Sequence, residues 1–155
     1  MSETKHMHAL RLRAFLPYRL SVLSNTISKQ IAALYQSQFG LSIWQWRVMA
    51  VLGEAAGLDA TEIVTRTAMD KVAVSRAVTG LIELGHVRRE AVQHDGRRSL
   101  LFLTKKGQQT YSKIARIAQS EEKAMTDVLT KAEAEELNQL LEKLADVVSP
   151  DRALW

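Results

Sequence analysis

Two short segments of this 155-residue chain gather side chains that can pair with a polyanion. One is a run of small polar and basic residues on one side of a predicted helix over residues 71–84. The other is the segment 88–98, which holds four arginines around an Asp-Gly turn. Guanidinium groups pair with phosphates and guanine edges, and hydroxyls bond to either, so this chemistry suits a nucleic-acid duplex. The expected contact residues are Thr61, Lys71, Val72, Ser75, Arg76, Thr79, Asp95, Arg97 and Arg98.

These side chains have different expected roles on a duplex. A helix in the major groove reads bases from its exposed face, where Arg76 can make a paired contact to guanine worth about 1–3 kcal/mol. Val72 can touch a thymine methyl group, and Thr61 can bond a phosphate beside exposed backbone N–H groups. Arg97 suits a narrow minor groove, and Asp95 can fix its direction by bonding the turn. The alternative is two solvated surfaces, a helix face that meets only water and a hairpin kept in solution by its charge.

Capping signals predict the elements that position these side chains. Asp59 and Glu62 form a capping box that opens a short helix. Asp70 can cap the next helix, over residues 71–84, and Gly85 can end it. The hydrophobic period then changes from helical to alternating, which predicts two strands joined by a polar turn, over residues 87–92 and 99–103.

Longer helices are expected on both sides of this helix, turn, helix and hairpin. Aliphatic residues recur at spacings of three and four over residues 17–38, a capping box at Ser42 opens a helix that Gly53 ends, and Thr104 caps a helix to about Val128. The expected fold class is therefore mainly α with a small β-hairpin wing, a winged helix-turn-helix with N- and C-terminal dimerisation helices. We expect a single domain over residues 1–155, in which the dimerisation helices cover residues 10–40 and 105–148 and the DNA-binding lobe covers residues 42–104.

The first and last helices each carry an aliphatic stripe that one copy of the chain has little left to cover. Leaving both stripes in water would be costly, at roughly 1.5–3 kcal/mol for each fully buried aliphatic side chain. We therefore expect a homodimer, whose interface includes Leu137, Leu140, Leu141, Leu144 and Val148. In the alternative, the two helices cover each other within a monomer.

Charge is unevenly distributed along the chain, which has a formal net charge of +4. Residues 88–106 hold six Lys or Arg against two acids, whereas residues 120–151 hold three lysines against nine acids. The first region suits a polyanion and the second is repelled by one, although either patch can simply be a solvated face. We expect the acidic region to lie away from DNA.

The composition and motifs exclude several kinds of site. The chain has no cysteine, so it has no disulfide, thiolate metal ligand or thiol redox switch. It lacks His-Glu-x-x-His, Gly-x-Ser-x-Gly and a glycine-rich phosphate loop, so we expect no enzyme activity, no metal and no cofactor. No run of about 18 apolar residues predicts a membrane span and no signal peptide is evident, which favours a cytoplasmic location.

Together these motifs resemble those of the MarR family of winged helix-turn-helix regulators. The resemblance covers roughly residues 10–148, and its more specific parts are the Asp-x-Arg tip and the Leu-Thr-x-x-Gly step. It implies that Arg97 is the wing arginine, that Asp95 is its partner, and that Ser75 and Arg76 lie on the base-reading helix. The residues that carry it are Asp70-Lys71-Val72-Ala73-Val74-Ser75-Arg76, Leu84-Gly85, Asp95-Gly96-Arg97-Arg98 and Leu103-Thr104-Lys105-Lys106-Gly107.

The resemblance also implies a homodimeric repressor that sits on a palindromic promoter site and leaves it when a small molecule binds. Family members often bind aromatic acids, or their coenzyme A thioesters, between the dimer helices and the DNA-binding lobe. The alternative, which is favoured for Trp46, is that Trp46 belongs to the core and that Arg19 is only a surface charge. The main alternative function is an architectural protein that binds DNA through phosphates without sequence preference. The expected effector residues, which combine arginine with aromatic rings, are Tyr18, Arg19, Trp44, Trp46 and Arg47.

Overall fold

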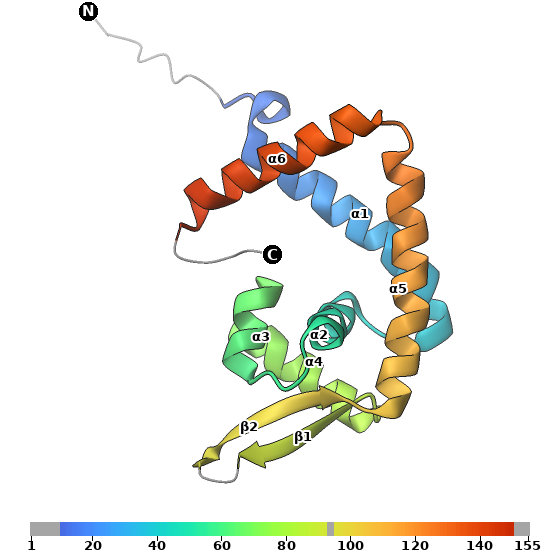
Figure 1. Cartoon of the computed structure of the whole chain (residues 1–155), viewed down its shortest axis with the longest axis vertical. Helices are drawn as coiled ribbons and strands as arrows, with labels where there is room; N and C mark the ends of the chain where they lie inside the picture. The colour runs from blue at the N-terminus through green and yellow to red at the C-terminus, as the bar shows by residue number, and fades with distance from the viewer. Residues whose placement is uncertain (1–9, 93–94, 151–155) are drawn as a thin grey trace, which may run out of the picture.

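The computed structural model describes residues 10–92 and 95–150, apart from the side chains of residues 95–97. Within this part the chain is mainly helical with one two-stranded antiparallel sheet, which confirms the predicted fold class. Figure 1 shows the hairpin at one end of the molecule and α6 at the other, with the long helix α5 running between them. The elements are η1 (Leu12–Ala14, a 3₁₀ turn), α1 (Leu16–Phe39), α2 (Ile43–Glu54), α3 (Ala60–Thr67), α4 (Lys71–Glu83), β1 (Val87–Val92), β2 (Asp95–Leu103), α5 (Lys105–Thr126) and α6 (Lys131–Val148).

Side-chain caps fix the starts of five helices. The capping boxes at Ser42, Asp59 and Thr130 have both of their reciprocal hydrogen bonds. Asp70 and Thr104 each accept a hydrogen bond from the third residue of the helix that follows. Each bond satisfies a backbone N–H that the helix itself leaves unpaired, so these polar residues determine where the helices begin.

The buried core joins the hairpin and the helix-turn-helix to α1 and α5. Its fully buried large side chains include Tyr35 on α1, Met49 on α2, Ile63 on α3, Leu81 on α4 and Ile114 on α5. Helix α2 packs against α3, α4, α5 and β2, so it is the central element of this core. None of the described helices is both long enough and apolar enough to cross a membrane.

The prediction that Gly53 ends the second helix is wrong. Helix α2 continues to Glu54, and the backbone N–H of Ala55 still donates to the carbonyl of Val51 at 3.0 Å. Gly53 is instead the place where α5 approaches α2, because a Cβ at this position would lie 2.5 Å from two ring carbons of Tyr111. The missing side chain serves close packing rather than termination.

The second strand is longer than its apolar run indicates. It begins at Asp95 rather than Ser99, and the pairing shifts its register between Ala91 and Val92. Backbone ladder bonds need no apolar side chain, so the polar residues near the tip continue the strand. The hairpin therefore extends the arginine-bearing segment away from the core.

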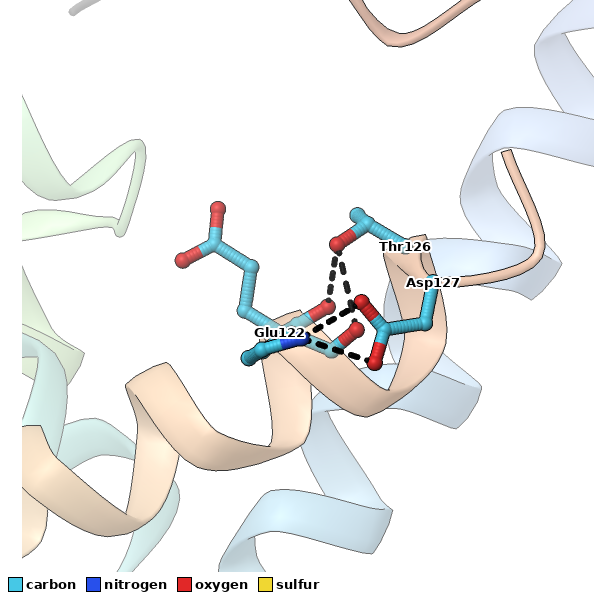
Figure 2. Close-up of polar contacts among 4 residues, drawn as sticks. Glu122, Thr126 and Asp127 are labelled. Atoms are coloured by element: carbon cyan, nitrogen blue, oxygen red, sulfur yellow. Dashed lines mark hydrogen bonds and ion pairs between the residues drawn. The ribbon is translucent and has the colours of Figure 1, made fainter. Parts of the chain in front are cut away.

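The prediction that α5 continues to about Val128 is also wrong by two residues, because the helix ends at Thr126, where polar side chains gather (Figure 2). The hydroxyl of Thr126 donates to the carbonyls of Glu122 and Lys123 at 2.9 and 3.3 Å. The ammonium of Lys123 donates to both carboxylate oxygens of Asp127 at 2.7 and 2.9 Å. These bonds hold the side chains of the last helical turn together just before the turn that leads to α6.

The aliphatic stripes of the terminal helices are uncovered in the single chain. Leu23 on α1 is 58% exposed, and Leu140 and Leu144 on α6 are 49% and 40% exposed. No residue of α6 is buried. The two helices therefore do not fully cover each other in the single chain, and their apolar faces remain partly open for another surface.

Candidate nucleic-acid interface

Helices α3 and α4 are held together by a short turn with a left-handed residue. Ala68 follows α3 with a φ of 51°, a conformation that ends the helix and redirects the chain toward Asp70. The carboxylate of Asp70 then accepts a hydrogen bond from Ala73 N at 2.8 Å and starts α4. The inner side of α4 is aliphatic, with Val74, Ala77, Val78 and Leu81 buried.

The outer side of α4 is polar and open, as predicted. Lys71, Val72, Ser75, Arg76 and Thr79 are all exposed, and the apolar Val72 is 59% exposed. Neither Lys71 nor Arg76 takes part in an ion pair within the described residues. Their charges are therefore available to an outside anion.

A hollow of about 370 Å³ lies between α3, α4 and β1. It brings together three predicted contact residues, Thr61, Lys71 and Ser75. Val72, Arg76 and Thr79 are not among its lining residues and lie elsewhere on the open face of α4. The hollow is also lined by Arg89, which was not among the predicted site residues.

Strand alternation explains why Arg89 belongs to this site and Arg88 does not. Successive side chains of a strand point to opposite faces, so Arg89 faces away from its two neighbours. Arg88 pairs with Glu90, and its guanidinium carbon lies 4.7 Å from the ring centroid of Phe102. The period-two pattern of the strand, applied to the two arginines separately, is the sequence signal that could have identified Arg89.

The hairpin carries the remaining predicted DNA contacts. Asp95 and Arg97 lie in β2, but their side chains are outside the described part of the structure. Arg98 is described, and its Nη2 donates to Oδ2 of Asp59 at 2.7 Å. The backbone N–H of Glu62 and the Arg98 guanidinium hold the pKa of Asp59 below its usual value. The Arg98–Asp59 ion pair thus connects the hairpin to the start of α3.

The five predicted effector residues do not form one cluster in the single chain. Tyr18 and Arg19 line a hollow of about 650 Å³ along the first half of α1. On α2, the guanidinium of Arg47 lies 5.4 Å from the ring centroid of Trp44, which is 51% exposed. The structure therefore brings Trp44 and Arg47 together and places Tyr18 and Arg19 at a second position.

Trp46 belongs to an aromatic stack that joins three helices. Its ring centroid lies 5.9 Å from that of Tyr35 on α1 and 5.8 Å from that of Tyr111 on α5. Burial raises the pKa of Tyr35 to about 12, although the nearby Arg47 acts in the opposite direction. Trp46 is partly buried against the core, which matches the core interpretation of this residue.

A buried histidine lies at the junction of α4, β1 and α5. His86 is 5% exposed, and its Nδ1 has no hydrogen-bond partner in the described residues. Burial and the charge of Lys106 lower the pKa of His86 below its ordinary value of about 6.5. The folded protein therefore holds this imidazole neutral.

This lowered pKa predicts a loss of stability in acid. The unfolded chain takes up the proton near pH 6.5, and the folded chain takes it up only at lower pH. Neutral His86 therefore makes its full contribution to the free energy of unfolding above about pH 6.5. It is lost as the pH falls through the lowered folded pKa. Thermal unfolding at pH 7.5 and 5.5 should show a smaller decrease in Tm for His86→Leu than for the parent. Equal decreases in both proteins would contradict this role.

Comparison with known proteins identifies the class to which this geometry belongs. Residues 39–98 match the family model of the MarR family. A MarR/EmrR family transcriptional regulator from Acinetobacter sp. ADP1 is similar with a TM-score of 0.83 and 27% identity, over 91% of this chain and 99% of that one. A putative MarR family transcriptional regulator from Listeria monocytogenes, complexed with 26mer DNA, is similar with a TM-score of 0.80 and 23% identity, over 88% and 90%.

A third similar structure contains a small molecule. NadR in complex with 4-hydroxyphenylacetate matches with a TM-score of 0.74 and 24% identity, over 95% of this chain and 99% of that one. Comparison with curated proteins gives no match.

The fold and the matches are those of winged helix-turn-helix transcriptional regulators, a class of DNA-binding protein rather than of enzyme. Residues 39–98 match the MarR family model, and the chain is similar to MarR/EmrR family regulators over most of its length. The resemblance based on the α4 segment, the hairpin tip and the Leu-Thr-x-x-Gly step is thus confirmed.

Proposed function

We propose that the protein is a repressor that binds a palindromic operator as a homodimer and leaves it when a small aromatic acid binds. The observation that carries this proposal is the row of exposed side chains on α4, from Lys71 to Thr79, beside an arginine-bearing hairpin. The aliphatic inner face fixes α4 to the core, so its outer face is free to enter a major groove. The DNA complex of the Listeria relative, which has the same fold, supports a duplex as the partner.

The charged groups around α4 suggest which side chains contact bases and which contact phosphates. Arg76 lies on the open face and suits a paired contact to guanine. Thr61, Lys71 and Arg89 converge on the hollow between α3, α4 and β1, where a phosphate group would meet two positive charges and a hydroxyl. Arg97, near the hairpin tip, suits the flanking minor groove.

Replacing Arg76 with alanine should weaken binding to the operator and reduce the preference for it. A paired guanine contact is worth about 1–3 kcal/mol, so the dissociation constant should rise roughly five- to 150-fold. The measurement is a competition assay at fixed salt between DNA from upstream of the protein's own gene and random DNA. Arg116→Ala, which removes a positive charge from α5 instead, is the matched control and should retain both affinity and preference.

The same assay tests the architectural alternative. A protein that binds only through phosphates would show equal affinity and a similar steep salt dependence for both duplexes. Equal affinity of the parent protein for the two DNAs would therefore refute sequence-specific regulation. An Arg76→Ala protein with unchanged preference would refute only the role of this arginine.

The open apolar faces of α1 and α6 support the homodimer. Both helices are amphipathic, and each leaves large aliphatic side chains at least 40% exposed, including Leu20 and Leu23 on α1 and Leu140 and Leu144 on α6. A dimer with two-fold symmetry presents two copies of α4, and its preferred DNA site then has matching half-sites. The predicted palindrome follows from this symmetry.

The Trp44–Arg47 pair supports an aromatic acid as the effector. A guanidinium beside an exposed indole can bind a carboxylate while the ring stacks on the indole. The 4-hydroxyphenylacetate complex of NadR shows that a protein of this fold can bind such a molecule. Tyr18 and Arg19 on α1 also combine an aromatic ring with a guanidinium, at a second position.

Replacing either candidate arginine tests this assignment. With 4-hydroxyphenylacetate as the probe, Arg47→Ala or Arg19→Ala should require roughly 10- to 150-fold more ligand to release DNA, because a charge-assisted hydrogen bond contributes about 1.5–3 kcal/mol. Lys29→Ala, which also removes an exposed positive charge from α1, should respond like the parent. An unchanged response in one arginine variant would exclude that residue from the effector site.

A further inference from the structure

The hairpin is attached to the segment before α3 at two separate points. The first attachment is a backbone bridge, in which Leu101 N donates to Leu58 O at 2.9 Å and Gly57 N donates to Leu101 O at 3.2 Å. The second is the ion pair of Arg98 on β2 with Asp59, whose atoms are 2.7 Å apart. Both attachments join segments that are far apart in the sequence, and Arg98 follows Asp59 by 39 positions.

One carboxylate serves two elements at the second attachment. Oδ1 of Asp59 accepts the N–H of Glu62 at 3.0 Å and caps α3, while Oδ2 accepts the Arg98 guanidinium at 2.7 Å. The Asp59 side chain is only 19% exposed, whereas that of Arg98 is 60% exposed. These two bonds favour the charged carboxylate and thereby lower the pKa of Asp59.

Two points of attachment constrain the direction of the hairpin, whereas one point allows it to pivot. Leu101 and Arg98 are three residues apart on one strand, which corresponds to about 10 Å at roughly 3.3 Å per residue. Arg98 is the attachment nearer the tip, and Arg97 is the residue next to it on the tip side. The orientation of the strand at Arg98 therefore sets the path by which Arg97 leaves the body of the protein.

We propose that Arg98 is a positioning residue that fixes the wing relative to the helix-turn-helix through Asp59, and that it is not itself a contact to DNA. This inference rests on the proposed operator binding. The sequence predicts that Arg98 contacts DNA directly, whereas here Arg98 affects DNA binding only by orienting the wing. The charge of Arg98 is already matched by Asp59, so it adds little attraction for phosphate.

The two roles of Arg98 predict opposite results for one substitution. Asp59→Asn removes the charge that holds Arg98 but keeps a good N-terminal cap for α3. If Arg98 positions the wing, this variant weakens operator binding. If Arg98 contacts phosphate, the variant binds as well as the parent or better, because a repulsive carboxylate has gone and the arginine is released.

The experiment is a double-substitution cycle on operator affinity, measured at several salt concentrations. Arg98→Ala and Asp59→Asn should each weaken binding by roughly two- to five-fold, the range of exposed ion pairs, and the double variant should be no weaker than either single one. Arg98→Lys should recover part of the loss. The dependence of affinity on salt should be the same in Arg98→Ala as in the parent, because no phosphate contact is lost.

Asp70→Asn is the matched control, because it removes the same charge from the cap of α4, where the carboxylate accepts the N–H of Ala73. This control should not couple to Arg98→Ala. Additive losses in the Asp59 and Arg98 variants, or a salt slope reduced by about one in Arg98→Ala, would overturn the proposal.

Amide exchange of the protein without DNA separates this inference from the proposed function. Arg98→Ala and Asp59→Asn should both increase exchange in β1 and β2 and leave α5 unchanged. Unchanged exchange in the hairpin would refute the attachment even if operator binding is specific. A parent protein that shows no preference for its upstream DNA, together with faster hairpin exchange in the variants, would refute the proposed function and keep the attachment.

Discussion

Replacing Leu140 and Leu144 together by aspartate is expected to convert the proposed dimer into a monomer. Both side chains are half exposed on α6, so a partner surface gains roughly 1 kcal/mol from covering each remaining half. Two aspartates would add the larger penalty of burying unpaired carboxylates. The dimer dissociation constant should therefore rise more than about 100-fold, which sedimentation or light scattering at micromolar concentration can measure.

The affinity for the operator should fall when the dimer dissociates. A monomer reaches one half-site and loses the gain of linked binding, which is commonly on the order of 100-fold or more. Asn138→Asp with Gln139→Asp is the matched control, because it adds the same two charges to α6 at positions off the leucine stripe. This control should remain dimeric, and a leucine variant that stays dimeric and binds DNA normally would refute the α6 interface.

Replacing Gly107 with alanine is expected to destabilise the fold severely, although it adds only one methyl group. A Cβ at Gly107 would collide with the carbonyl oxygen of His86 and lie 3.0 Å from its carbonyl carbon. This oxygen has little freedom to move, because it accepts hydrogen bonds from Thr104 N at 3.0 Å and from the Thr104 hydroxyl at 3.3 Å. We expect a loss of about 3 kcal/mol or more and a decrease in Tm of roughly 6–12 °C.

Gly40→Ala separates this steric effect from backbone strain. Gly40 has a φ of 65°, and a Cβ added there would meet no other atom within 4 Å, so alanine should cost only about 1–2 kcal/mol of left-handed strain. Gly107 is not among the residues with positive φ, and its cost comes from contact alone. Similar decreases in Tm for the two variants, measured by thermal unfolding, would show that the α5 contact is not tight.

The fit at Gly107 gives a physical meaning to the Leu-Thr-x-x-Gly step. Thr104 caps α5 and also bonds the carbonyls of Gly85 and His86, at 2.7 and 3.3 Å. The glycine three residues later lets the first turn of α5 lie against the same carbonyl of His86. The step therefore joins α5 to the end of α4, which is how the DNA-binding lobe is fixed to the helices expected to form the dimer.

Helix starts and helix faces could be predicted from the sequence, because the interactions that set them are local. Asp59, Asp70, Thr104 and Thr130 bond backbone groups within three residues, and each has the residue type of a cap. The two faces of α4 follow from its period of about 3.6 residues alone. The candidate DNA contacts on this helix could be found for the same reason.

Residues whose roles depend on distant neighbours could not be predicted in the same way. The sequence predicts that Gly53 ends a helix, and only the fold shows Tyr111 packed against it. The sequence likewise gives no sign that Arg98 forms an ion pair with Asp59, on which the proposed positioning role depends. Arg89 joins the α4 site only because β1 crosses next to that helix. In all three cases the deciding neighbour lies on another element of the fold, and no local pattern records which elements meet.

Periodicity and short-range bonds were enough to predict the helix-turn-helix with its hairpin, the polar face of α4 and the resemblance to the MarR family. Which charges remain available and which are already matched could be seen only in the folded chain, because that depends on what packs beside them. The tertiary structure also showed that the stripes of α1 and α6 stay partly open within one chain, since neither helix fully covers the other.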